Sequence, residues 1–110
     1  MVLEPKFMVF KEGEGFYYRL HSAGGGVILS GDGYKTKEEC IKCIIMARDF
    51  AHVNGLYKSL ELNGSYYFDL LSPWGETVGK SAAFDSPRLL ERGIEAVKQN
   101  APKAQIEDLG

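Results

Sequence analysis

The sequence predicts an α+β fold, in which two tandem β-β-β-α-β repeats form one antiparallel sheet with both helices on one face, related by a pseudo-two-fold axis. Sliding the chain against itself by 50 positions matches residue classes without gaps, as Tyr17 on Tyr67 illustrates. Each repeat also has short alternating, aromatic-rich segments followed by one segment of helical periodicity. The chain has 110 residues, so we expect a single domain, 1–110, with repeats at about 7–56 and 57–109.

The repeat depends on identities that recur in order together with the apolar pattern around them. Chance supplies a few identities, but it rarely supplies the whole pattern. The identical pairs are Tyr17/Tyr67, Leu20/Leu70, Ser22/Ser72, Gly25/Gly75, Ile44/Ile94 and Ala51/Ala101.

In the first repeat, turn residues separate three predicted strands from one helix. The helix is expected near 36–51, because Thr36 and Glu39 form the T-x-x-E pattern of a capping box. The predicted strands are Phe7–Lys11, Phe16–His21 and Val27–Ser30, the last ended by Gly31-Asp32-Gly33.

The second repeat is predicted in the same order. Its helix is expected near 86–100, with Pro87 in the first turn. The predicted strands are Tyr57–Leu62, Tyr66–Leu71, Glu76–Gly79 and Ala104–Leu109.

Alternation along the aromatic strands predicts which side chains face the helices. The helix-facing set is Phe16, Tyr18, Leu20, Tyr66, Phe68 and Leu70. The set on the other face is Tyr17, Arg19, His21, Tyr67, Asp69 and Leu71.

Composition excludes several classes of protein. Hydrophobic residues make up 45% and charged residues 25%, which is typical of a globular domain and not of a disordered chain. The net charge of −2 is unlike that of a general nucleic-acid or membrane-surface binder. The segment Met1–Lys6 has no signal-peptide features, so we expect a cytoplasmic protein with no membrane association and with its two cysteines kept as thiols.

The second repeat resembles the YegP-like family, bacterial proteins whose domain is described as being of unknown function. The resemblance rests on Tyr67-Phe68-Asp69-Leu70, on Gly75 with Val78-Gly79, and on Gly93–Pro102 followed by Ala104, Ile106, Asp108 and Leu109. It implies β3-α-β units assembled in pairs around one continuous sheet, with the C-terminal strands exchanged between units. It implies no catalytic residues. The first repeat departs from the pattern at Cys43–Arg48.

Cys40 and Cys43 form the single CxxC of the chain, which suggests either a redox pair or half of a metal site. Zinc normally needs four ligands, and only His21 and His52 are available among the other nitrogen donors. In the repeat alignment Cys40 and Cys43 fall on Leu90 and Gly93, at inward positions of the helix. We therefore favour buried thiols, and expect no metal and no cofactor.

Two further patterns favour turns over active sites. Gly24-Gly25-Gly26 is followed by a strand and not by the helix that a phosphate loop requires. Ser22, His21 and Asp32 suggest a hydrolytic triad, but adjacent strand residues point to opposite sides. We expect no catalytic residue and no enzymatic activity.

Helix one is apolar on more than one side. Ile41 and Ile45 occupy positions that carry Glu91 and Glu95 in helix two. We interpret this second apolar face as a surface for a protein partner or weak self-association. The alternative is that the N-terminal segment Met1–Pro5 covers it.

Aromatic residues outside the core complete the candidate binding set. Tyr17 and Tyr67 on the outer sheet face, with Trp74 at a turn, are compatible with base stacking or with a small-molecule or peptide ligand. We therefore predict a non-enzymatic binding or protein-interaction module that uses Ile41, Ile45, Tyr17, Tyr67 and Trp74. The alternatives are a thiol redox or metal-binding protein and a weak nucleic-acid binder.

Overall fold

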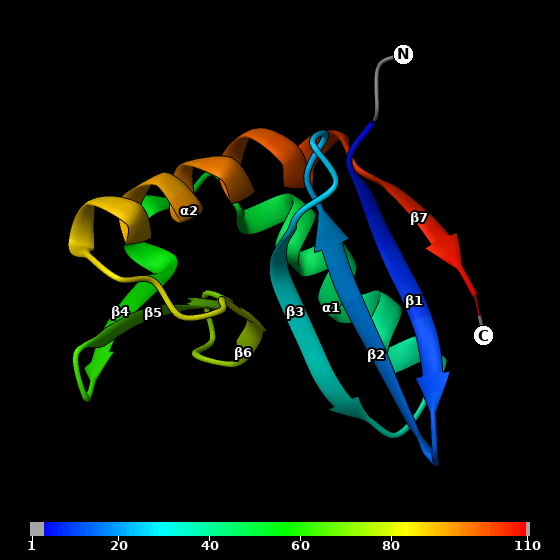
Figure 1. Cartoon of the computed structure of the whole chain (residues 1–110). Helices are drawn as coiled ribbons and strands as arrows, with labels where there is room; N and C mark the ends of the chain where they lie inside the picture. The colour runs from blue at the N-terminus through cyan, green and yellow to red at the C-terminus, as the bar shows by residue number, and fades with distance from the viewer. Residues whose placement is uncertain (1–3, 110) are drawn as a thin grey trace.

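The computed structural model describes residues 4–109 as one seven-stranded sheet and two helices (Figure 1). The strand order is β4-β5-β6-β3-β2-β1-β7. We call residues 6–50 the first half and residues 57–100 the second half. In chain order the elements are β1 (Lys6–Glu12), β2 (Gly15–His21), β3 (Val27–Tyr34), α1 (Lys37–Phe50), β4 (Tyr57–Leu62), β5 (Ser65–Leu71), β6 (Thr77–Lys80), α2 (Pro87–Asn100) and β7 (Gln105–Asp108).

The sheet is mixed, so the prediction of a purely antiparallel sheet is wrong at one pair. β7 runs parallel to β1, with Phe7 opposite Ile106 and Val9 opposite Asp108. The chain enters β7 from the end of α2, which returns it to the same end of the sheet at which β1 starts (Figure 1). Parallel pairing requires such a crossover between the strands.

The two 14-residue helices begin within one residue of their predicted starts. The Thr36 hydroxyl accepts a hydrogen bond from the amide of Glu39, and the Ser86 hydroxyl accepts one from the amide of Leu89. Each bond satisfies an amide that has no partner inside the helix. Pro87 occupies the first turn of α2, where backbone amides make no intrahelical hydrogen bond, so the missing N–H of proline costs none.

Both helices pack on one face of the sheet, and the core lies between. Phe7 is opposite Leu20 and Val9 is opposite Tyr18, and all four are fully buried. The alternate residues of these strands are only half-buried or exposed. The same cluster includes Phe68, Leu70 and Val78 of the second half and Ile44, Ala47, Leu90 and Val97 of the helices.

The end of the third strand and the last strand of the first repeat differ from the prediction. β3 continues through Gly31 and Gly33 to Tyr34 because a register shift, between Tyr18 opposite Gly31 and Phe16 opposite Tyr34, absorbs one extra residue. Between α1 and β4 no further strand completes the first repeat. A 3-10 turn at Asn54–Leu56 leads directly into β4, so the full β-β-β-α-β unit is not formed twice.

No helix in the described part of the chain is long and apolar enough to cross a bilayer.

Candidate functional site

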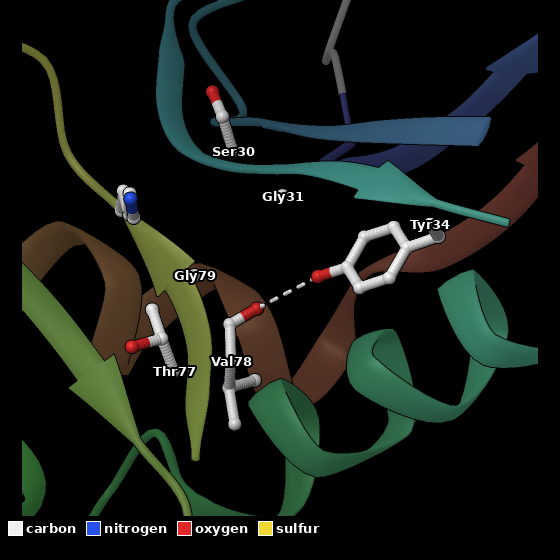
Figure 2. Close-up of a pocket in the computed structure, with 7 residues that line it drawn as sticks. Ser30, Gly31, Tyr34, Thr77, Val78 and Gly79 are labelled. Carbon is white, nitrogen blue, oxygen red and sulfur yellow. Dashed lines mark hydrogen bonds between the residues drawn. The ribbon is translucent and has the colours of Figure 1, made fainter. Parts of the chain in front are cut away.

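The sheet is weakest where its two halves meet, between β3 and β6. Ser30 opposite Lys80 is the one registered pair there. A hollow of about 240 Å³ lies at this junction, with Gly31 and Tyr34 on one side and Thr77, Val78 and Gly79 on the other (Figure 2).

Two phenols bridge this junction. The buried Tyr18 hydroxyl donates to the Val78 carbonyl at 2.7 Å, and the Tyr34 hydroxyl points at the same carbonyl from 3.4 Å (Figure 2). The second distance is longer than an ordinary hydrogen bond, so we assign most of the stabilisation to Tyr18. Burial raises the pKa of Tyr18 well above its usual value, so this phenol remains a donor at neutral pH.

Gly31 and Gly79 are required by the ring of Tyr18. A Cβ at Gly31 would meet that ring at 2.1 Å, and a Cβ at Gly79 would meet the Tyr18 hydroxyl at 2.5 Å. These glycines therefore serve the core contact between the halves. They do not mark a close approach to a ligand.

The sheet face opposite the helices has an aromatic and basic cluster in the first half. The Phe10 and Tyr17 rings stack at 5.6 Å, and the Arg19 guanidinium lies over Phe10 at 5.0 Å. Two hollows of about 240 and 300 Å³ border these side chains. The second hollow also involves Met8 and Leu109, and Leu109 is 56% exposed. We call Met8, Phe10, Tyr17, Arg19 and Leu109 the open-face cluster.

The predicted site residues do not form one surface. Tyr17 belongs to the open-face cluster, whereas Ile45 is 46% exposed on α1, across the sheet. Ile41 is half-buried and packs against the core, so the prediction that it is exposed is wrong. Trp74 is 74% exposed in the β5–β6 turn and makes an edge contact with Phe50 at 6.1 Å.

Tyr67 is half-buried opposite Leu60 in the second half, at a position equivalent to Tyr17. Of the segment Met1–Pro5 predicted to cover helix one, residues 1–3 lie outside the described residues, Glu4 is exposed and Pro5 is buried.

Cys40 is fully buried, and Cys43 is half-buried against the same core. Burial, and then the neighbouring Cys43 and Asp108, raise the pKa of the Cys40 thiol to about 11. A thiol that remains protonated at neutral pH is a poor nucleophile. Among the residues that the structure describes, no group of three or more His, Cys, Asp or Glu is placed to hold a metal.

His21 and the glycine run form a hairpin turn. The His21 ring nitrogen Nδ1 lies 3.1 Å from the Gly25 carbonyl, and the Ser22 amide donates to the Gly26 carbonyl at 2.8 Å. Gly25 has a φ of +96°, which favours glycine. The side chain of Asp32 lies outside what the structure describes, and His21 is part of the turn.

Sequence reasoning missed Met8, Phe10 and Leu109 in the open-face cluster. Strand alternation over Lys6–Glu12 places Met8 and Phe10 on the outer face, because they alternate with Phe7 and Val9. Leu109 could not be placed, because its position depends on the parallel pairing of β7.

Comparison with known proteins places the chain in a family. Residues 62–108 match the family described as "Domain of unknown function (DUF1508)". A UPF0339 protein of Pseudomonas aeruginosa is 31% identical over 108 residues, 96% of this chain and 98% of that protein. A UPF0339 protein of Stutzerimonas stutzeri is 31% identical over 101 residues, 91% of this chain and 90% of that protein.

Two solution structures share the fold. The structure of yegP from E. coli, a protein of unknown function, has a TM-score of 0.91 at 24% identity and covers 99% of this chain and 96% of its own. A UPF0339 protein of Shewanella oneidensis has a TM-score of 0.90 at 22% identity, covering 97% and 92%. UPF0339 protein YegP of E. coli is also 28% identical over 94 residues, 84% of this chain and 86% of YegP. The chain therefore belongs to the UPF0339 family, which includes YegP.

Proposed function

We propose that this protein is a non-enzymatic protein-interaction module that binds a folded partner through the open-face cluster. The observation that carries the proposal is the composition of the cluster, which combines Met, Phe, Tyr and Arg on a sheet face that neither helix covers. These residue types are enriched in protein interfaces, and Tyr and Arg are common among the residues that dominate binding energy. Apolar side chains bordering shallow hollows favour a protein surface over a buried small ligand.

We also propose that the chain has the tandem organisation that its sequence predicts. β2 pairs with β1, and β5 with β4, in registers offset by 50 residues: Phe7 is opposite Leu20, and Tyr57 is opposite Leu70. We infer that the two halves are copies of one unit. The aromatic and basic cluster is then a specialisation of the first half, because Arg19 is replaced by Asp69 in the second.

Site-directed photo-crosslinking in cells tests the interaction surface. A benzoylphenylalanine is placed at Tyr17, with a matched control at the exposed Lys103. We expect a defined protein adduct from Tyr17 that disappears with Arg19→Glu, while the exposed charge reversal Glu14→Lys leaves it unchanged. Absence of an adduct from a folded protein, or the same adduct from Lys103, overturns the proposal. An adduct to nucleic acid would support the stacking alternative instead.

A further inference from the structure

The two ends of the sheet are unequal. β1 and β4 occupy equivalent places, since each is the outer partner of an aromatic strand in the same register. β7 adds to the outer edge of β1, in parallel, over four residue pairs. Within residues 4–109 no strand adds to the outer edge of β4, because the segment after α1 runs directly into β4 itself.

Equivalent residues are less buried in the second half than in the first. Phe7 and Val9 of β1 are fully buried beside β7. Their counterparts in β4 are the half-buried Tyr57 and the exposed Ser59. On the helices, Ile44 is fully buried, whereas its counterpart Ile94 is half-buried. The second half therefore exposes a surface that a strand covers in the first half.

Two hollows lie along this surface, between β4 and α2. One, of about 370 Å³, is lined in part by Tyr57 and Ile94. The other, of about 320 Å³, is lined in part by Leu90. Ser59 and Glu91 line both hollows, so the two are adjacent. We call this region the β4 groove.

We propose that the β4 groove binds an extended segment of another protein, which adds to the sheet as a strand parallel to β4. Strand addition supplies main-chain hydrogen bonds at an unpaired sheet edge, and the adjacent hollows select alternate side chains. The pairing of Ile106 with Phe7 predicts an apolar side chain opposite Tyr57, above Ile94. This site goes beyond the open-face cluster, which lies in the other half.

The charge of the β4 groove specifies the next residue of the segment. Its charged lining residues are Glu61, Glu91, Glu95 and Lys98. The Lys98 ammonium already donates to the Asn54 side chain and forms an ion pair with Glu95 at 4.0 Å. A residue two positions after the apolar one would lie opposite Ser59, beside Glu91. A Lys or Arg at that position complements Glu91.

The chain's own C-terminal strand does not fit. In β7 the acidic residues Glu107 and Asp108 form ion pairs with Lys6 at 3.3 Å and Lys37 at 2.9 Å. The counterparts of these lysines in the second half are Leu56 and Pro87, which carry no charge. In a second copy of this chain, Glu107 would lie opposite Lys58, but Asp108 would lie opposite Ser59 beside Glu91, where Pro87 stands in place of Lys37. The occupant is a partner segment of the form apolar-x-basic.

The test is a titration of the full-length, isotope-labelled protein with blocked synthetic peptides followed by NMR. The probe is Thr-Gln-Ile-Thr-Arg-Thr-Ser, which places Ile and Arg in the proposed register, and the matched peptide has Glu in place of Arg. With peptide up to about 1 mM, we expect saturable shifts confined to β4 and α2. The Glu peptide is expected to bind at least about tenfold more weakly.

Charge reversal provides the decisive control. Glu91→Lys should reverse the preference so that the Glu peptide binds better, because Glu91 is exposed and its replacement leaves the core intact. Glu14→Lys makes the same change in net charge far from the groove and should leave both affinities unchanged. No saturable shift at β4, or a preference that Glu91→Lys does not alter, overturns the proposal. Dimerisation through β4 without peptide would also overturn it, in favour of a second copy.

Discussion

Tyr18 joins the two halves of the sheet through one buried hydrogen bond, which makes Tyr18→Phe a direct probe of that junction. The change removes the hydroxyl that donates to Val78 at 2.7 Å and leaves the ring in place. A buried hydrogen bond contributes about 0.5–1.5 kcal/mol net, and a carbonyl left without a donor raises the cost. We expect the free energy of unfolding to fall by about 1–2 kcal/mol, which corresponds to a Tm decrease of roughly 4–8 °C.

Tyr34 offers a second donor to the same carbonyl, so the two hydroxyls are expected to be coupled. Tyr34→Phe alone should cost less, about 0.5 kcal/mol, because its bond to Val78 is 3.4 Å long. The double variant should cost about 0.5–1 kcal/mol more than the sum, since the carbonyl then has neither phenol as a donor.

Urea unfolding followed by circular dichroism measures these differences, with the slope of the transition checked for constancy. Tyr17→Phe is the matched control, because it removes a phenol hydroxyl from the open face without touching the junction. A Tyr18→Phe variant as stable as this control, with a strictly additive double variant, would refute the reasoning.

Further predictions concern pH, the thiols and helix α1. Burial raises the pKa of Tyr18 in the folded state. Its contribution to the free energy of unfolding is therefore complete below about pH 10 and is lost as the pH rises above that value. Urea unfolding at several pH values should show that Tyr18→Phe loses less stability over this range than the unsubstituted protein does. In folded protein a thiol reagent should modify Cys43 quickly and the buried Cys40 only at the unfolding rate, and equal rates would contradict this. Cys40→Ser should cost about 1–3 kcal/mol in urea unfolding. Ile45→Glu should change stability by less than about 0.5 kcal/mol, whereas Ile41→Glu, which replaces a side chain packed on the core, should cost about 1–3 kcal/mol.

Local chemistry made most of the elements predictable. Thr36 caps α1 as its T-x-x-E spacing predicted, because a hydroxyl three residues before a free amide suits a helix start wherever it occurs. Pro87 likewise marked the first turn of α2, which Ser86 caps. The helix-facing positions of β2 and β5 were also predictable, since strand alternation has a strict period of two. The candidate site was predicted in part, with Tyr17 on the outer face.

The candidate surfaces depended more on tertiary contacts. Ile41 and Ile45 are both aliphatic and four residues apart, so periodicity put them on one face; packing on the core half-buries the first and leaves the second exposed. The open-face cluster needed the position of Leu109, which is set by the pairing of β7.

The sequence by itself determined both helices and most of the strands, which residues of the aromatic strands face the core, and the resemblance to the family. The elements follow from turn residues, caps and periodicity within a few neighbouring positions, whereas the resemblance rests on the motifs of the second repeat. Only the tertiary structure decided that β7 pairs in parallel with β1, that β3 continues through Gly31, and that within residues 4–109 no strand pairs with the outer edge of β4. The reason is that strand pairing joins residues far apart in the chain, about 100 positions for Phe7 and Ile106, so no local pattern encodes which edge is covered and which is left open.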